Sequence, residues 1–216
     1  MTLMKPLQIA IADDHSIIRE GLVQLLNTHP GITVVGQASS GKEAIKLADD
    51  LELDCLVLDI DFQDRNGVEV IKAIRRNNQK LPILVLSMHP PSQYAARILS
   101  AGALGYITKS EPTQELVLAI RRVATGAKYI SPMVAEILAE RFGDAQAGVD
   151  PHQCLSDREH QFMMMVATGL TVNAIADKLS LSPKTVSMYR TRTLKKMGMK
   201  TNAELVHYAI KNNLLA

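Results

Sequence analysis

Cys55-Leu56-Val57-Leu58-Asp59 is the stretch that decides the fold. Its first four residues are apolar, with the length and branching typical of a buried parallel strand, and the carboxylate of Asp59 ends the run abruptly. We therefore expect Asp59 at the carboxyl end of a strand. Open α/β sheets bind their ligands along that edge, so Asp59 is a candidate site residue on position alone.

Three further apolar runs also end in polar side chains. Residues 7–12 are followed by Asp13 and Asp14, residues 83–86 by Ser87, and residues 105–108 by Lys109. Right-handed crossovers between parallel strands would bring these ends to one edge of the sheet. Three carboxylates, a hydroxyl and an ammonium group would then lie together, a set suited to a divalent cation and a phosphoryl group.

The first half of the chain alternates between strand and helix signals. A second strand is predicted at residues 32–38, and Ser40 and Glu43 have the spacing of a capping box that opens a helix running to about residue 51. The other helices of this half are predicted at residues 17–26, 67–77, 94–101 and 112–125. Five strands and five helices in strict alternation predict an α/β fold with a doubly wound five-stranded parallel sheet.

The composition is typical of a globular protein, with 47% hydrophobic and 21% charged residues among 216. The first apolar run ends at Asp13 after about six residues, too short for a membrane span and without a signal-peptide cleavage region, so we expect a cytoplasmic protein. Cys55 and Cys154 share no C-x-x-C spacing, which argues against a zinc site or a redox pair. The six histidines lack the i, i+4 spacing of a helical metal site, and none is expected to be a ligand.

Charge is distributed unevenly along the chain. Residues 1–130 have a net charge of 0, residues 131–154 of −3 and residues 155–216 of +5. A basic terminal region behind a neutral one suggests a nucleic-acid-binding output joined to a controlling module. We therefore expect one domain at 1–130, a connecting helix and flexible linker at 131–154, and a second domain at 155–216. The linker is predicted at residues 143–151, which have two glycines and little apolar content.

The second domain has only helical patterns. Ser156 and Glu159 form a capping box, and the methionines at 163–165 are expected in a hydrophobic core. A short helix, a break at residues 180–183 and a longer basic helix ending at Met197 have the spacing of a helix-turn-helix. The sequence predicts a small all-α domain of four helices.

The first 130 residues resemble the receiver domain of two-component response regulators, and the resemblance lies in Ala12-Asp13-Asp14-His15, Asp59, Ser87 and Lys109, in this order. Asn66-Gly67 also fits the loop that follows the phosphoacceptor in that family. One position departs from the pattern, because Gln63 stands where the family usually has proline. Proline would fix one backbone dihedral angle, so its absence predicts a less rigid loop.

The resemblance implies a role for each polar group at the sheet edge. Asp59 is the expected phosphoacceptor, whose carboxylate attacks phosphorus to form an acyl phosphate. Mg²⁺ is the implied cofactor, and its expected ligands are Asp14, Asp13 through water, Asp59 and the backbone carbonyl of Asp61. The ion and Lys109 would neutralise charge on the phosphoryl oxygens.

The resemblance also implies a conformational switch. The Ser87 hydroxyl is expected to hydrogen-bond the phosphoryl group and draw its loop toward Asp59. Tyr106, three residues before Lys109, is expected to turn inward when that hydroxyl moves. His89 is expected at the rim of the same site because it follows Ser87 by two residues.

The last 62 residues resemble the DNA-binding domain of the LuxR and NarL/FixJ families through Leu155-Ser156-x-Arg158-Glu159, Gly169-Leu170-Thr171, Ile175-Ala176-x-x-Leu179, Ser182-Pro183-Lys184-Thr185-Val186 and Lys196-Met197-Gly198. The helix at residues 183–197 is then expected in the major groove. Helical spacing puts Lys184, Ser187, Met188, Thr191 and Lys195 along one side of this helix, with Arg190 and Arg192 flanking it. We expect Lys184, Ser187, Met188 and Thr191 near bases, and Thr185, Arg190 and Arg192 nearer phosphates. Val186 and Leu194 are expected on the core side.

The two resemblances together imply a NarL/FixJ-type response regulator, a DNA-binding transcriptional regulator activated by phosphorylation of Asp59. Its expected partners are a sensor histidine kinase or phosphotransfer domain, double-stranded DNA, and a second copy of the chain when phosphorylated or DNA-bound. No membrane partner and no enzymatic turnover are expected.

Three alternatives stay open. The receiver could serve only for dimerisation, independently of phosphorylation, and Gln63 favours that hypothesis while the complete set of charged site residues opposes it. An aspartate-dependent phosphatase is a second alternative, since Asp59-Ile60-Asp61 has its D-x-D spacing. A small-molecule sensor of the LuxR type is the third.

Overall fold

The computed structural model describes residues 5–143, 151–212 and 214–215, and the chain divides into two compact units at Ala135/Glu136. Each unit is described by itself. The predicted linker at residues 143–151 lies mostly outside the described residues. Among the helices that the structure describes, none is long and apolar enough to cross a lipid bilayer.

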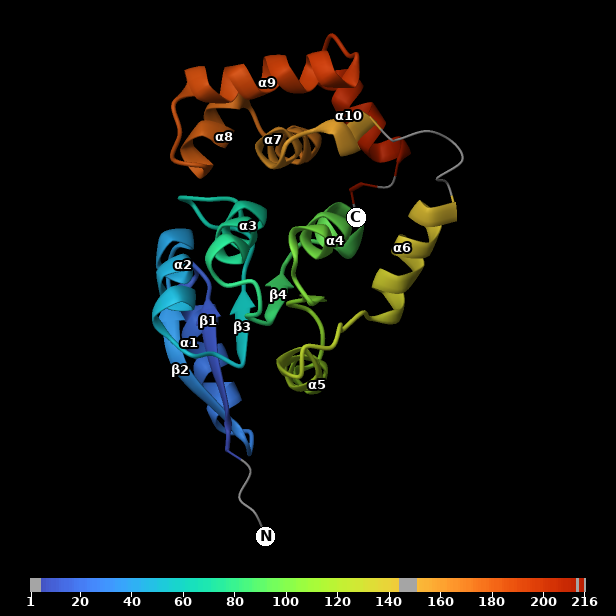
Figure 1. Ribbon diagram of the computed structural model, residues 1–216. Coiled ribbons are helices and arrows are strands. Elements are labelled where there is room, and N and C mark those ends of the chain that lie inside the picture. The colour runs from blue at the N-terminus through green and yellow to red at the C-terminus, as the bar shows by residue number, and fades with distance from the viewer. Residues whose placement is uncertain (1–4, 144–150, 213, 216) are drawn as a thin grey trace. The chain divides into compact units, whose positions relative to one another are not determined.

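The first unit is built on a parallel sheet of five strands in the order β2-β1-β3-β4-β5 (Figure 1). The strands are β1 (Leu7–Ala12), β2 (Ile32–Ala38), β3 (Cys55–Leu58), β4 (Ile83–Ser87) and β5 (Gly105–Thr108). The run that ends at Asp59 is the central strand, and all its residues are buried. A strand covered on both faces has no solvent side, which explains its continuous apolar sequence.

Five helices alternate with these strands, and the predicted doubly wound α/β fold is confirmed. They are α1 (Ser16–Asn27), α2 (Gly41–Asp50), α3 (Gly67–Asn77), α4 (Pro91–Ala101) and α5 (Thr113–Ala124). Residues of α1 and α5 share one buried cluster with alternate residues of the strands, whereas α2, α3 and α4 contact one another in sequence. The strand order reverses direction between β1 and β3, which is where such sheets bind ligands.

The expected capping box at the start of α2 is only half correct. The Ser40 side chain accepts a hydrogen bond from the Glu43 backbone N–H at 3.2 Å, as a cap should. The Glu43 carboxylate, however, accepts from the backbone N–H and the hydroxyl of Ser39, both at 2.7 Å, rather than from Ser40. Ser39 offers two donors to one carboxylate oxygen, which explains the preference.

The second unit is entirely helical within its described residues. The helix α6 (Pro132–Gly143) spans the boundary between the units, and a short 3₁₀ helix, η2 (Pro151–Cys154), leads into the domain. Its four main helices are α7 (Asp157–Ala167), α8 (Val172–Lys178), α9 (Pro183–Met197) and α10 (Asn202–Lys211), and the predicted four-helix domain is confirmed.

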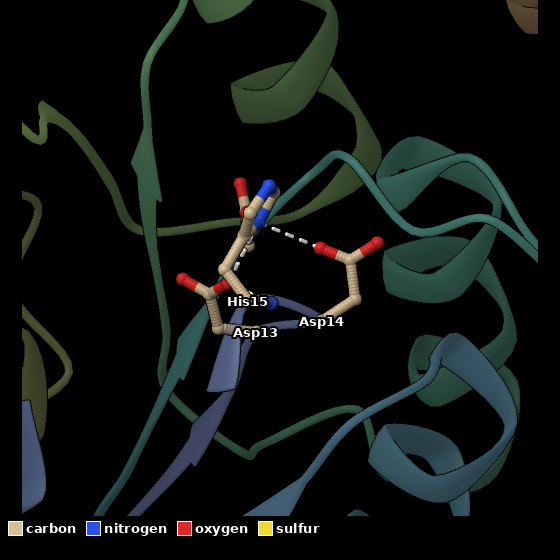
Figure 2. Close-up of side chains that lie close together, drawn as sticks. Asp13, Asp14 and His15 are labelled. Carbon is tan, nitrogen blue, oxygen red and sulfur yellow. Dashed lines mark hydrogen bonds and ion pairs between the residues drawn. The ribbon is translucent and has the colours of Figure 1, made fainter. Parts of the chain in front are cut away.

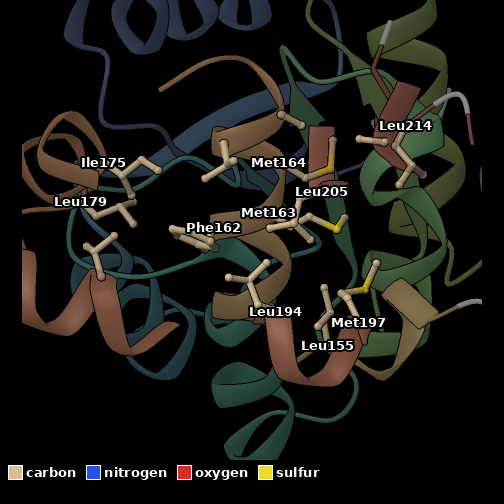
Figure 3. Packing of buried hydrophobic residues seen from close by; sticks show 14 of the residues in the cluster. Leu155, Phe162, Met163, Met164, Ile175, Leu179, Leu194, Met197, Leu205 and Leu214 are labelled. Carbon is tan, nitrogen blue, oxygen red and sulfur yellow. The ribbon is translucent and has the colours of Figure 1, made fainter. Parts of the chain in front are cut away.

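One hydrophobic core joins these helices (Figure 3). Phe162 and Met163 are fully buried at its centre, and Met164 is 4% exposed, so the methionine cluster fills the core as expected. The predicted capping box at Ser156 and Glu159 is present in full and begins α7. Since every member of the core belongs to residues 155–215, this unit has its own source of folding free energy.

Candidate functional site

The carboxyl ends of β1, β3 and β5 bring two carboxylates and an ammonium group into contact. Lys109 Nζ donates to Asp13 Oδ2 at 2.6 Å and to Asp59 Oδ2 at 2.8 Å. All three side chains are at least nine-tenths buried. These residues lie up to 96 positions apart in the sequence, so the sheet topology alone assembles the cluster.

Asp59 is held by backbone bonds on both sides of its side chain. Its N–H donates to the Ala12 carbonyl at 2.8 Å, continuing the β1–β3 ladder, and its Oδ1 accepts from the Ile60 N–H at 2.7 Å. Burial raises the pKa of the carboxyl above its ordinary value, although Lys109 acts in the opposite direction. Asp59 therefore needs positive charge nearby to remain an ionised nucleophile.

Lys109 supplies part of that charge. Burial by itself would lower the pKa of the ammonium, but Asp59 and Asp13 outweigh it and raise the pKa above the ordinary value. Its backbone N–H also donates to the Ser87 carbonyl at 2.7 Å, which fixes the start of the β5–α5 loop. Lys109 thus remains charged and is directed at both carboxylates.

Asp14 lies beside this cluster, and the nearest group to its buried Oδ1 is His15 Nδ1, in an ion-pair contact of 2.8 Å. Burial raises the pKa of Asp14, and Asp13 and Asp61 add to that effect. Side-chain ligand atoms of Asp13, Asp14, His15 and Asp59 all lie within 4.8 Å of one another. Three hard carboxylate donors gathered this closely fit a divalent cation such as Mg²⁺.

His15 is the group closest to the Asp14 carboxylate in Figure 2. Its Nδ1 lies 2.8 Å from Asp14 Oδ1 and 3.3 Å from Asp13 Oδ1. Its backbone N–H donates to Asp13 Oδ1 at 2.8 Å and orients that carboxylate. No histidine was expected to be a ligand, because none has the i, i+4 spacing of a helical metal site, a criterion that does not cover a histidine directly after two aspartates.

The Asp61 side chain is not among the clustered ligand atoms of the described residues. Its carboxylate is engaged by His89, whose Nε2 lies 2.9 Å from Oδ2 and 3.1 Å from Oδ1. This contact joins the β3–α3 loop to the β4–α4 loop at the rim of the site, where His89 was expected. The expectation for Asp61 concerned its backbone carbonyl, which stays a prediction.

Ser87 and Tyr106 form one hydrogen-bonded arrangement through the backbone of His89. The Ser87 hydroxyl accepts from the His89 N–H at 3.1 Å, and the Tyr106 hydroxyl donates to the His89 carbonyl at 2.6 Å. Both side chains are buried, and burial raises the pKa of Tyr106. A movement of the Ser87 hydroxyl would therefore shift the loop at His89, whose carbonyl accepts the hydrogen bond from Tyr106.

The loop after Asp59 is anchored although Gln63 replaces proline. The Asp64 carboxylate accepts from the N–H groups of Gly41 and Lys42, at 2.8 and 3.1 Å, and so ties the loop to the start of α2. Gly67 is required where the loop enters α3, because a Cβ there would collide with the Cα of Ile60. These contacts supply restraint that the missing proline would otherwise give.

The second candidate site is the exposed side of α9. Ser182 caps this helix by accepting from the Thr185 N–H at 3.1 Å, and Gly198 ends it in the left-handed conformation. The turn before it contains Ser180 at φ +51°, a conformation that is uncommon outside glycine. Val186 and Leu194 face the core, as predicted.

Six of the eight predicted DNA-facing residues are exposed on α9. They are Lys184, Ser187, Met188, Thr191, Arg192 and Lys195. Thr185 and Arg190 are partly buried, because Thr185 joins the cap at Ser182 and Arg190 donates to Asn202 at 2.9 Å. Five cationic side chains on one helix, at positions 184, 190, 192, 195 and 196, give it a basic surface.

Comparison with protein families agrees with both sites. Residues 9–121 match the response regulator receiver domain, and residues 153–209 match the bacterial regulatory proteins of the luxR family. The chain is 34% identical to the response regulator GacA of Pseudomonas aeruginosa over 97% of this chain and 98% of that protein. It is 35% identical to the response regulator UvrY of Escherichia coli over 96% of this chain and 95% of that protein.

Solved structures are similar as well. A structure of the response regulator RcsB of Salmonella typhimurium has 25% identity and a TM-score of 0.69, and the match covers 97% of this chain and 99% of that one. RcsB from the same organism, bound to the promoter rprA in the presence of phosphomimetic BeF₃⁻, has 25% identity and a TM-score of 0.64, with 94% and 98% covered.

Proposed function

This chain belongs to the response regulators that join a receiver domain to a LuxR-type DNA-binding domain, and we propose that phosphorylation of Asp59 controls its binding to DNA. The observation that carries the proposal is the Lys109 ammonium, which contacts both Asp13 and Asp59 at the strand ends. This arrangement suits Asp59 to receive a phosphoryl group, because Lys109 can shift its hydrogen bonds to the phosphoryl oxygens.

The chemical step is transfer of a phosphoryl group to a carboxylate oxygen of Asp59. One carboxylate oxygen attacks phosphorus as the bond from phosphorus to the donor nitrogen of a phosphohistidine breaks, and the product is an acyl phosphate on Asp59. Lys109 stays protonated and stabilises the phosphoryl charge. The Ser87 hydroxyl donates a hydrogen bond to a phosphoryl oxygen, which moves the loop that contains His89 and that the Tyr106 hydroxyl contacts.

Asp13, Asp14, Asp59 and the carbonyl of Asp61 would hold Mg²⁺, which supplies charge neutralisation on the phosphoryl oxygens when bound. The close approach of the Asp13, Asp14 and Asp59 carboxylates, whose ligand atoms lie within 4.8 Å of one another, supports this assignment. The excess of carboxylate charge over the single Lys109 ammonium supports it too, because burying uncompensated anions is costly.

The partners follow from the two domains. A histidine kinase or phosphotransfer domain would donate the phosphoryl group. The protein would bind double-stranded DNA as a homodimer on paired half-sites, with the exposed side of each α9 in the major groove. The promoter-bound RcsB structure supports this reading by likeness. The protein would act in the cytoplasm, where DNA lies, without turnover on free phosphate esters.

Genome-wide mapping of bound DNA tests the proposal. Wild-type protein should occupy discrete sites, and Asp59→Ala should reduce occupancy several-fold at those same sites, while exposed Asp50→Ala leaves it unchanged. Equal occupancy by the Asp59 variant would favour the phosphorylation-independent dimerisation module. The lack of discrete sites in all three samples would refute regulated DNA binding.

Asp14→Asn should stabilise the receiver in the absence of divalent cations. Burial raises the pKa of Asp14, so its ionised form opposes folding at neutral pH. We expect removal of this partly buried charge to gain about 1 kcal/mol, which corresponds to a rise in Tm of about 3–5 °C. The gain should disappear below the ordinary pKa of 3.8, where the wild-type carboxyl is protonated in both the folded and the unfolded state. Calorimetry over a pH series would measure this difference.

Addition of Mg²⁺ should make the wild-type protein melt at a higher temperature than Asp14→Asn. A ligand at 100 times its Kd stabilises the folded state by about 2.7 kcal/mol, and only the wild type keeps the full ligand set. Asp50→Asn, at an exposed carboxylate, is the matched control and should respond to Mg²⁺ like the wild type. An Asp14 variant that melts lower than the wild type without Mg²⁺ would show that the carboxylate stabilises the fold instead.

A further inference from the structure

One of the five cations of α9, Lys196, is paired with a buried carboxylate. Lys196 Nζ donates to Glu159 Oε2 at 2.6 Å, and the same oxygen accepts from the Ser156 N–H at 2.8 Å. The Glu159 side chain is 5% exposed and that of Lys196 is 43% exposed. The pair thus joins a buried anion in the first turn of α7 to a partly exposed cation in the last turn of α9.

The burial of Glu159 makes this pair costly to break. Burial by itself would raise the pKa of Glu159, but hydrogen bonds from Lys196 and Ser156 outweigh it and lower the pKa below the ordinary value. Glu159 is therefore ionised at neutral pH. If Lys196 turned away toward a DNA phosphate, the carboxylate would stay buried without its cation, which costs far more than breaking an exposed ion pair.

A second contact joins α9 to Glu159. Thr193, about one turn before Lys196, is fully buried, and its hydroxyl donates to the Glu159 carbonyl at 3.4 Å. The side of α9 with Thr193 and Lys196 therefore lies on α7, whereas Arg192 and Lys195 are exposed. The apolar core adds attraction between the helices, but apolar contacts have no preferred direction, whereas charge-assisted hydrogen bonds do. The contacts with Glu159 thus restrain the rotation of α9 against α7.

We propose that Glu159 is a positioning residue for base recognition, which acts through Lys196 to hold α9 at the rotation that presents its DNA-facing side chains to base edges. The inference rests on the proposed binding of DNA through α9. Hydrogen bonds to bases depend on distance and angle, whereas contacts of flexible lysine and arginine side chains with phosphates tolerate small shifts of the helix. Loss of the pair should therefore weaken binding to a specific site more than binding to random DNA, and Lys196 itself should contribute no phosphate contact.

Affinity measurements on two DNA duplexes of equal length test the proposal, one with a site found by genome-wide mapping and one of random sequence. The protein is the full-length chain treated with acetyl phosphate and Mg²⁺. The double variant Glu159→Gln/Lys196→Met removes both charges at similar side-chain size, so no buried charge is left unpaired, and glutamine can still accept from the Ser156 N–H. Its affinity for the specific site should fall about tenfold, while its affinity for random DNA should change less than about twofold, with an unchanged salt dependence.

Three further lysine variants serve as controls. Lys195→Ala removes an exposed cation next to Lys196, and it should weaken binding to both duplexes and reduce the slope of log K against log salt by about 0.9 per protomer. Lys46→Ala, at an exposed position on α2, should change neither affinity. Lys196→Arg keeps a donor for the Glu159 carboxylate and should retain the affinity for the specific site.

An affinity for random DNA close to that of the wild type shows that the double variant is folded. Unchanged affinity for the specific site would overturn the positioning role. A slope reduced as in Lys195→Ala would show that Lys196 contacts a phosphate directly, and would overturn it too. Equal loss of both affinities would assign the pair to folding stability alone and contradict the proposal. A wild-type protein that binds both duplexes equally would instead refute sequence-specific DNA binding, and with it the proposed function.

Discussion

Asp59→Asn should abolish phosphoryl incorporation completely. A small phosphodonor such as acetyl phosphate, with Mg²⁺, should add one phosphoryl group to the wild-type protein. The amide oxygen of asparagine is a far weaker nucleophile than a carboxylate and cannot form the acyl phosphate. Asparagine has nearly the same shape as the buried Asp59, and its amide oxygen can accept one of the two hydrogen bonds that Asp59 accepts, from Lys109 or from the Ile60 N–H. Mass spectrometry of the intact protein measures the result.

Asp61→Asn is the matched control, since it makes the same substitution two residues further along the same loop. Its side chain contacts His89 rather than the clustered ligands, so labelling should persist. Equal labelling of wild type and Asp59→Asn would move the phosphoacceptor to another residue. Loss of labelling in Asp61→Asn as well would show that the contact with His89 is required for the reaction.

The fold was predictable because it depends on local patterns that tertiary contacts reinforce. Four apolar runs, each ended by a polar group, were sufficient to identify β1, β3, β4 and β5. A local rule failed at Ser40, where two capping arrangements compete and the hydroxyl of the preceding Ser39 decides between them. Spacing alone does not reveal such a competition, because both arrangements satisfy it.

The site was predictable where residues act at strand ends and not where they meet across loops. Asp13, Asp59 and Lys109 follow strands, so the topology places them together. The contacts of Asp64 with the start of α2 and of His89 with Asp61 join segments 23 and 28 residues apart in ways that no periodicity encodes. Likewise, His15 was set aside by a rule for helical metal pairs, although its neighbours in sequence are the carboxylates it contacts.

A fragment of residues 150–216 should bind DNA without phosphorylation, and the unphosphorylated full-length protein should bind the same site about tenfold more weakly. The fragment keeps the complete core of the second unit, so α9 is presented as in the whole protein. If only about one tenth of the unphosphorylated molecules expose α9, their apparent Kd rises about tenfold. A full reversal from 1:99 to 99:1 needs roughly 5.5 kcal/mol, which new bonds to Ser87 and Lys109 and dimerisation on DNA would supply together.

Substitutions separate the hypothesis of occlusion, in which the unphosphorylated receiver covers α9, from a mechanism by dimerisation. Lys184→Ala removes an exposed cation of α9 and should weaken binding of both proteins, whereas Asp59→Asn should matter only in the full-length chain treated with a phosphodonor. Binding is measured at matched salt and protomer concentration, because contacts with phosphates make affinity steeply dependent on salt. Equal affinity of the fragment and the unphosphorylated protein would exclude occlusion. Phosphorylation would then act by bringing two receivers together, since pairing two α9 helices on adjacent half-sites raises affinity without any change in a single helix.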